Sequence, residues 1–271
     1  MDGHAAAERP QADGCRTGFM SLTVPRKPWI FGPEPDPSAR KRLFCFPYAG
    51  GGATAFHSWR PFLDLNGVEL CCVQLPGRET RFREALVTSM DELVALVCDG
   101  IDPYLDRPFS FFGHSMGTLV SFEVTRELAR RGHELPEWLL MSGALPPHRR
   151  PVESLHTLPP AEFIDAVARR YSGLPREVLA NRDLLDIVMP ILRADFELIE
   201  NYRYKPATAL RVKIAAFGGS LDSSVAPAEL PHWRDFTALP ERFQLILFEG
   251  DHFFLSHQRI QLLNEIARVL T

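Results

Sequence analysis

The chain has 271 residues, which is enough for one large α/β domain or at most two small ones. Its hydrophobic content of 45% and charged content of 24% are typical of a globular protein, and its net charge of −4 provides no basic field to attract nucleic acid or an anionic membrane. No apolar run is long enough for a membrane-spanning helix, and the first 20 residues lack the apolar core of a secretion signal. We therefore expect a cytoplasmic protein with no nucleic-acid or membrane partner.

The cysteines give no sign of a disulfide framework. There are five of them, an odd number, with no C-x-x-C spacing. Cys45, Cys71 and Cys72 lie within apolar runs, where a reduced cysteine behaves as a small hydrophobic side chain. We predict buried free thiols, no metal site and no cofactor.

The first part of the chain is predicted to be a tail. Residues 1–38 contain many prolines and small or charged residues without sustained periodicity, which is typical of disorder. Within it, Met20 is a second possible start, and residues 29–31 are candidates for attaching the end of the tail to the surface of a domain that covers residues 39–271.

A buried strand is predicted at residues 42–46, followed by a glycine-rich loop at residues 47–53. Three consecutive glycines allow close approach of the backbone and leave N–H groups free to face a ligand. A phosphate-binding loop is disfavoured because no Gly-Lys-Ser/Thr follows.

Strands and helices then alternate, which predicts a parallel sheet with helices on both faces. The apolar patterns predict strands at 68–75, 109–112 and 137–142, and helices at 59–63, 91–105 and 118–131, the last closed by Gly132.

About 60 residues interrupt this alternation. Residues 161–171 and 182–204 look helical, with Pro190 dividing the second segment, and they predict a helical lid inserted at about 148–206. Strands at 210–217 and 243–248 and a terminal helix at 260–270 complete the expected domain.

The strand at 109–112 leads into Gly113-His114-Ser115-Met116-Gly117, a G-x-S-x-G pattern. In a nucleophile elbow the serine occupies a strained turn between strand and helix, and larger side chains at the two glycine positions would collide with neighbouring backbone. The pattern alone is weak, since a turn with an incidental serine is an equally good interpretation.

The order of later residues favours the elbow. Ser115 follows the third predicted strand, Asp222 follows the fifth and His252 the sixth, which is the Ser–Asp–His order of α/β-hydrolases. We predict that fold, with Ser115 as nucleophile, His252 as its base and Asp222 as the acid that orients the histidine. The backbone N–H groups of Ala49 and Met116 are the predicted oxyanion hole, with Tyr48 as the alternative to Ala49.

Other histidines and carboxylates fit these roles less well. His114 is expected to pack beneath the elbow and His257 to lie on the surface of the terminal helix, whereas His4 is in the tail. No predicted strand directly precedes His57 or His148. The competing acids are Asp195, Asp251 and Glu249.

Several stretches together resemble the type II thioesterases, the stand-alone editing enzymes of polyketide and nonribosomal peptide synthases. The resemblance covers roughly residues 40–270, and one departure is Ser223, where the family often has proline after the acid. The stretches are Phe46-Pro47-Tyr48-Ala49-Gly50-Gly51, Gln74-Leu75-Pro76-Gly77-Arg78-Glu79, Phe112-Gly113-His114-Ser115-Met116-Gly117, Leu192-Arg193-Ala194-Asp195-Phe196 and Gly250-Asp251-His252-Phe253.

The resemblance implies hydrolysis of acyl thioesters on the phosphopantetheine arm of carrier protein domains, removing stalled or aberrant acyl groups. It supports the same triad and oxyanion donors. Apolar lid residues could roof an acyl chamber or simply form the lid's own core; they are Leu184, Leu185, Ile187, Val188, Ile191 and Leu192. Lid arginines could meet the carrier or the phosphate or simply be solvated; they are Arg169, Arg170 and Arg176.

Two alternatives stay open. A lipase, esterase or peptidase of the same fold would use the same triad, because the triad does not encode the leaving group. A catalytically silent partner that binds carrier proteins is the other alternative, and an intact triad is evidence against it.

Overall fold

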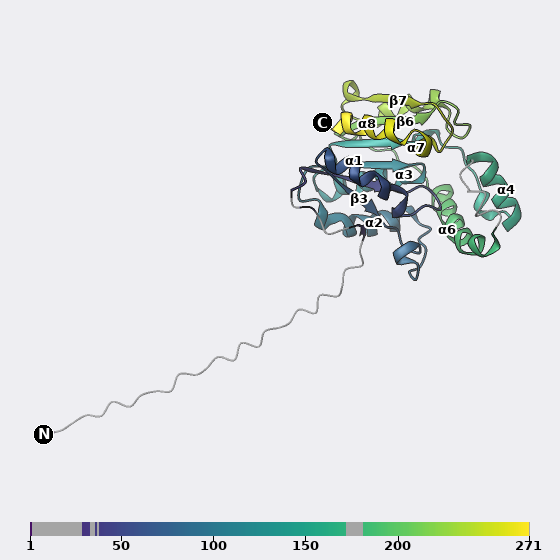
Figure 1. Cartoon of the computed structure of the whole chain (residues 1–271), viewed down its shortest axis with the longest axis horizontal. Helices are drawn as coiled ribbons and strands as arrows, with labels where there is room; N and C mark the ends of the chain where they lie inside the picture. Colours follow the sequence, from purple (N-terminus) through teal and green to yellow (C-terminus); the bar gives the residue numbers. More distant parts are fainter. Residues whose placement is uncertain (2–28, 33–35, 37, 172–180, 271) are drawn as a thin grey trace.

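Seven strands form one sheet in the order β1-β3-β2-β4-β5-β6-β7. The computed structural model describes residues 1, 29–32, 36, 38–171 and 181–270 (Figure 1). All neighbouring strands are parallel except β1, which pairs antiparallel with β3. The strands are β1 (Ile30–Phe31), β2 (Lys41–Phe46), β3 (Val68–Val73), β4 (Phe109–His114), β5 (Trp138–Ser142), β6 (Lys213–Gly219) and β7 (Gln244–Phe248). The predicted α/β-hydrolase architecture, with a mostly parallel sheet, is confirmed.

Helices cover both faces of the sheet because its strands are apolar on both sides. In β2, Phe44 and Phe46 pack into the core on the side of α2 and α3, whereas Leu43 and Cys45 pack on the side of α1 and α8. The α-helices are α1 (Arg60–Leu65), α2 (Met90–Ile101), α3 (Met116–Arg131), α4 (Pro160–Tyr171), α6 (Arg182–Asn201), α7 (Phe254–His257) and α8 (Arg259–Leu270). The 3₁₀ helices are η1 (Ala53–Trp59), η2 (Glu79–Arg81), η3 (Asp102–Tyr104), η4 (Pro147–Arg149), η5 (Leu155–Thr157), η6 (Pro227–Phe236) and η7 (Pro240–Arg242).

The predicted helical insertion lies between β5 and β6. Its helices α4 and α6 contact each other through the rings of Phe163 and Phe196, whose centroids are 5.4 Å apart, and Figure 1 shows both helices beyond one end of the sheet. We call η4, η5, α4 and α6 together the helical insertion. The limits of about 148–206 given for this insertion stay a prediction.

Several elements differ from the sequence prediction. Helix α6 is continuous across Pro190, because this half of the helix is exposed and water can reach the carbonyl that the proline leaves without its donor. The fifth predicted strand starts at Lys213 rather than at residue 210, since Leu210 forms an isolated bridge with Thr237. His257 ends the short helix α7 instead of lying on α8. Residues 30–31 do attach to the domain, but as an edge strand, β1.

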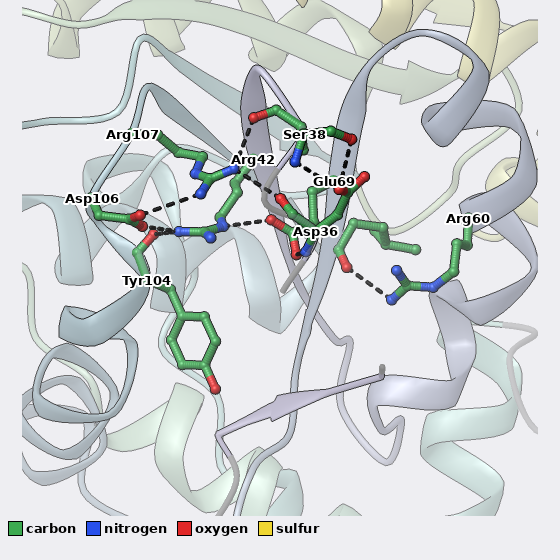
Figure 2. A network of polar contacts seen from close by, with 10 residues as sticks. Asp36, Ser38, Arg42, Arg60, Glu69, Tyr104, Asp106 and Arg107 are labelled. Atoms are coloured by element: carbon green, nitrogen blue, oxygen red, sulfur yellow. Dashed lines mark hydrogen bonds and ion pairs between the residues drawn. The ribbon is translucent and has the colours of Figure 1, made fainter. Parts of the chain in front are cut away.

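A buried ion pair ties the first residues of β2 and β3 together. Arg42 and Glu69 are register partners, and Nε of Arg42 lies 2.6 Å from Oε2 of Glu69 (Figure 2). Arg42 also donates to the carbonyl of Tyr104 and to Asp106, while Glu69 accepts the backbone N–H of Asp36. This network lies at the start of the parallel strands, whereas Ser115 follows the last residue of β4 at the opposite end of the sheet.

The described cysteines match the prediction of buried free thiols. Cys45, Cys71, Cys72 and Cys98 are all buried and unbridged. Cys15 and most of the predicted tail lie outside the described residues. No helix in the described part of the chain is long and apolar enough to cross a membrane.

Candidate active site

Ser115 occupies a strained turn between β4 and α3. Its φ of 53° and ψ of −115° lie in a region that residues with side chains rarely adopt. The turn is held by a 2.8 Å hydrogen bond from the N–H of Ser115 to the carbonyl of Ser142. A Cβ at Gly113 would lie 2.3 Å from the carbonyl oxygen of Gly117, and one at Gly117 would lie 2.1 Å from that of Phe46. Both glycines are therefore required by the close approach of β4, α3 and the end of β2.

Asp222 and His252 meet in the loops that follow β6 and β7. Nδ1 of His252 lies 2.7 Å from Oδ2 of Asp222, and both side chains are buried. Burial by itself raises the pKa of Asp222, but the hydrogen bond and charge of His252 and the hydrogen bonds from Ser224 outweigh it, so that the pKa is lowered overall. A carboxylate that stays ionised can orient the imidazole and stabilise its protonated form.

Ser224 is a polar contact that the sequence analysis missed. Its backbone N–H and its hydroxyl donate to Oδ1 of Asp222 at 2.8 and 2.7 Å, and its Oγ lies 3.0 Å from Nδ1 of His252. The signal was present in the sequence, because an aspartate readily accepts hydrogen bonds from the residue two positions later. The turn around Asp222 therefore forms without proline at Ser223.

The other ring nitrogen of His252 lies at the cavities that Ser115 borders. Nε2 of His252 is buried and has no hydrogen-bond partner among the described residues, and His252 borders the same two cavities as Ser115. His114 lies underneath, as expected, fully buried with Nδ1 2.9 Å from Oγ of Ser142. Burial and the nearby charge of His252 hold the pKa of His114 well below its usual range, so His114 stays neutral.

Two small cavities, each of about 40 Å³, meet at Ser115 and His252. The first is mainly apolar and is bordered by Ala49 on one side and by Val167, Leu192, Phe196 and Ile199 of the insertion on the other. The second is more polar and is bordered by Met116, Arg150, Glu153, Arg170 and Glu200. Tyr171, at the end of α4, borders both, and its ring centroid lies 5.1 Å from that of His252.

The residues expected to roof an acyl chamber separate into two groups. Leu192 borders the apolar cavity and Ile191 is buried, whereas Leu184 and Ile187 are 40% and 48% exposed and border neither cavity. Leu185 and Val188 are half-buried. The first turns of α6 extend beyond the site, so only its later turns face Ser115.

The expected lid arginines also differ from one another. Arg170 forms an ion pair with Glu153 beside the polar cavity, and Arg169 is exposed. Arg176 lies outside the described residues. Arg150 borders the same polar cavity and was not singled out from the sequence.

A second buried ion pair holds the glycine loop. Arg78, in the loop after β3, donates Nη1 and Nη2 to Oδ2 and Oδ1 of Asp195 on α6, each at 2.7 Å. The N–H of Gly50 donates to the same Oδ2 at 2.7 Å, and Nη1 of Arg78 also donates to the carbonyl of Gly51 at 3.0 Å. Asp195 is one of the competitors for the catalytic acid, but both of its oxygens are bonded to Arg78 or Gly50, whereas Nδ1 of His252 is bonded to Asp222.

Comparison with known proteins decides the family of this site. The model of the Thioesterase domain family matches residues 41–270. The chain belongs to the type II thioesterases. Gramicidin S biosynthesis protein GrsT of Aneurinibacillus migulanus is 37% identical over 243 residues, which cover 89% of this chain and 93% of that relative. Thioesterase PikA5 of Streptomyces venezuelae is 35% identical over 247 residues, 91% of this chain and 86% of the relative.

Solved structures agree with this assignment. The type II thioesterase BorB from the borrelidin biosynthetic cluster superimposes with a TM-score of 0.81 at 32% identity, covering 90% of this chain and 98% of BorB. The resemblance inferred from the sequence motifs is thus confirmed over nearly the whole domain, and this type II thioesterase is a hydrolase that acts on thioesters.

Proposed function

We propose that this thioesterase removes acyl groups from the phosphopantetheine arm of carrier protein domains by a Ser115–His252–Asp222 mechanism. The observation that supports it most is the placement of a buried Asp222–His252 pair, with Nε2 of His252 unpartnered among the described residues, at the same two cavities as the strained Ser115. No cofactor takes part in this chemistry, since the phosphopantetheine belongs to the substrate.

The proposed reaction has two halves. Oγ of Ser115 attacks the thioester carbonyl as its proton passes to Nε2 of His252, and the C–S bond then breaks while the proton moves to the leaving thiol. Water, deprotonated by the same nitrogen, attacks the acyl-serine ester, and the acid leaves as Ser115 recovers its proton. Asp222 keeps Nδ1 of His252 protonated throughout and stabilises the imidazolium.

Charge on the carbonyl oxygen requires donors in both halves. We assign the backbone N–H of Met116, which follows the nucleophile at the start of α3, and that of Ala49 in the glycine loop. Removing one such donor costs about 3 kcal/mol of transition-state stabilisation in acyl-transfer enzymes. Ala49 borders the apolar cavity, Met116 borders the polar one and Ser115 borders both, which supports this assignment.

The two cavities suit the two parts of an acyl-pantetheine thioester. An acyl chain would enter the apolar cavity between Val167, Leu192 and Phe196. The amide groups of the pantetheine arm would occupy the polar cavity, where Arg150 and Glu153 offer donors and acceptors.

The biological role follows from the relatives. The names of two relatives, Gramicidin S biosynthesis protein GrsT and the type II thioesterase BorB from the borrelidin biosynthetic cluster, each refer to a biosynthetic pathway. We extend to this chain the role of clearing stalled or aberrant acyl groups from a polyketide or nonribosomal peptide synthase, with its acyl or peptidyl carrier domains as partners.

A comparison of leaving groups tests this proposal. The purified protein is assayed on a propionyl-phosphopantetheinyl carrier protein, on the free propionyl-pantetheine thioester, and on p-nitrophenyl propionate. We expect kcat/KM to be highest for the carrier-bound thioester. Preference for the oxygen ester without any benefit from the carrier would support a general esterase instead, and the absence of turnover on all three would support the silent binding partner.

A further inference from the structure

We infer that Arg78 and Asp195 are positioning residues of the oxyanion hole: they hold the loop 48–51 in the conformation that presents the Ala49 N–H to the substrate. This inference rests on the proposed role of Ala49. Neither side chain borders the two cavities at Ser115, so both would act through the loop.

Residues 48–51 form a tight turn whose peptide planes are individually fixed. The N–H of Gly51 donates to the carbonyl of Tyr48 at 2.9 Å, and Gly50 has a φ of 75° whereas Ala49 does not have a positive φ. These are the features of a type II turn. Because the peptide bond is planar and trans, the bond to the Tyr48 carbonyl also fixes the direction of the Ala49 N–H, which belongs to the same peptide unit.

Asp195 fixes the next peptide unit. Its Oδ2 accepts the N–H of Gly50 at 2.7 Å, so the carbonyl of Ala49 in that unit must point away. If this unit flipped, the Ala49 carbonyl would face a buried carboxylate and the two oxygens would repel each other. Asp195 therefore stabilises the observed turn against its flipped alternative.

Arg78 holds both the carboxylate and the loop. Its bidentate bonds fix the rotamer of Asp195, and its third bond, to the carbonyl of Gly51, anchors the far side of the turn. Helix α6 also contacts the turn through Leu192, since a Cβ at Gly50 would lie 3.0 Å from Cδ1 of Leu192. The turn is thus held from β3 and from the helical insertion at once.

The Arg42–Glu69 pair is a matched control for this arrangement. It joins β2 and β3 at the end of the sheet opposite to the turn and is similarly buried, with 2% and 7% of the side chains exposed against 5% and 2% for Arg78 and Asp195. Its polar partners do not include residues 48–51 of the described structure. A loss of stability alone should therefore affect both pairs alike, whereas a loss of positioning should affect only the Arg78–Asp195 pair.

Four variants separate positioning from stability: Asp195→Ala, Asp195→Asn, the double variant Arg78→Met with Asp195→Leu, and the control Glu69→Gln. Asp195→Ala removes the acceptor of the Gly50 N–H and leaves Arg78 unpaired, so both kcat and the melting temperature should fall. Asp195→Asn keeps an acceptor oxygen for the Gly50 N–H but loses the charge that pairs with Arg78. Compared with Asp195→Ala, it should therefore regain more of the parent's kcat than of its melting temperature. The double variant removes both charges together and leaves no unpaired buried charge. Its melting temperature should therefore be higher than that of Asp195→Ala, while its kcat stays low.

The measurements are kcat and KM on the soluble propionyl-pantetheine thioester, corrected for the active fraction, together with the melting temperature. We expect kcat to fall about 10- to 100-fold in Asp195→Ala and in the double variant, with KM changed less than about threefold, because a misplaced oxyanion donor acts on the transition state. Glu69→Gln should lower the melting temperature with kcat within about twofold of the parent.

Two results would overturn the inference: kcat that follows the melting temperature through all four variants, or kcat unchanged in Asp195→Ala. The free thioester makes this test independent of carrier recognition. If the parent protein ignores the carrier but Asp195→Ala still loses kcat, the proposed substrate is wrong and the positioning role stands.

Discussion

Ser224 donates both its backbone N–H and its hydroxyl to one oxygen of Asp222, Oδ1, leaving the other oxygen to His252. The carboxylate is thereby oriented from both sides. The order of Ser115, Asp222 and His252 along the sequence predicts Asp222 as the acid, but the orientation of its carboxylate depends on Ser224, two residues later.

Replacing Ser224 by alanine should therefore weaken catalysis without abolishing it. Ser224→Ala removes one hydrogen bond from Oδ1 of Asp222 and the hydroxyl 3.0 Å from Nδ1 of His252, while the backbone N–H bond stays. We expect kcat to fall about 10- to 150-fold, because a hydrogen bond to a charged group contributes about 1.5 to 3 kcal/mol. Ser223→Ala is the control, because Ser223 is exposed, and a similar loss there would show that the effect is not specific to Ser224.

The lowered pKa of Asp222 predicts a pH dependence of stability. A carboxyl whose pKa in the folded protein is below its ordinary value of 3.8 contributes stability above that value, and the contribution is lost as the pH falls through the lowered pKa. Asp222→Asn should thus lower the free energy of unfolding at pH 7, and the difference from the parent should shrink below about pH 4. Urea unfolding of both proteins between pH 3 and 7 measures it, and a difference that stays constant with pH would contradict the account.

The apolar cavity predicts a change in acyl preference on truncation. Val167 on α4 is buried and borders this cavity, so Val167→Ala should admit longer chains. We expect the ratio of kcat/KM for octanoyl over propionyl thioesters to rise about tenfold, the usual effect of one or two methylene groups in a pocket. Val152→Ala, at a position that is 79% exposed in the same insertion, should leave the ratio unchanged. An unchanged ratio in Val167→Ala would exclude this cavity as the acyl site.

The cysteine thiols should be inert in the folded protein. Burial raises the pKa of Cys72 and of Cys98 to about 12, and it raises the pKa of Cys45 and of Cys71 as well. Since the thiolate is the reactive form, iodoacetamide at pH 8 should leave these four residues unmodified and the activity intact. Mass spectrometry of the treated protein checks this prediction, and modification of any of the four with loss of activity would argue for a cysteine nucleophile.

Local patterns were sufficient to predict strands β2 to β7 and the turn around Ser115, although not the edge strand β1. The apolar run that forms β2 is buried on both faces, and the G-x-S-x-G pattern encodes a turn in which Gly113 and Gly117 have no space for a side chain. Both signals depend on residues within a few positions of one another, which is why they could be read without the fold.

Contacts between distant segments could not be predicted in the same way. Arg78 and Asp195 are separated by 117 residues, and nothing near either one indicates that they form a pair or that Gly50 joins them. The exposure of Leu184 and Ile187 was missed for a related reason, since periodicity shows which side of α6 is apolar but not how far the helix extends past the site. Pro190 was expected to divide the helix, but an exposed helix tolerates the missing hydrogen bond.

The most direct test of the mechanism is to locate the acyl group during turnover. The protein is mixed with a propionyl-phosphopantetheinyl carrier protein, quenched in acid within milliseconds, digested and analysed by mass spectrometry. We predict a propionyl ester on Ser115 in the parent protein, no ester in Ser115→Ala, and turnover in that variant lower by about 10³-fold or more. An acyl group on another residue, or unchanged turnover in Ser115→Ala, would contradict the proposal that this thioesterase works through Ser115.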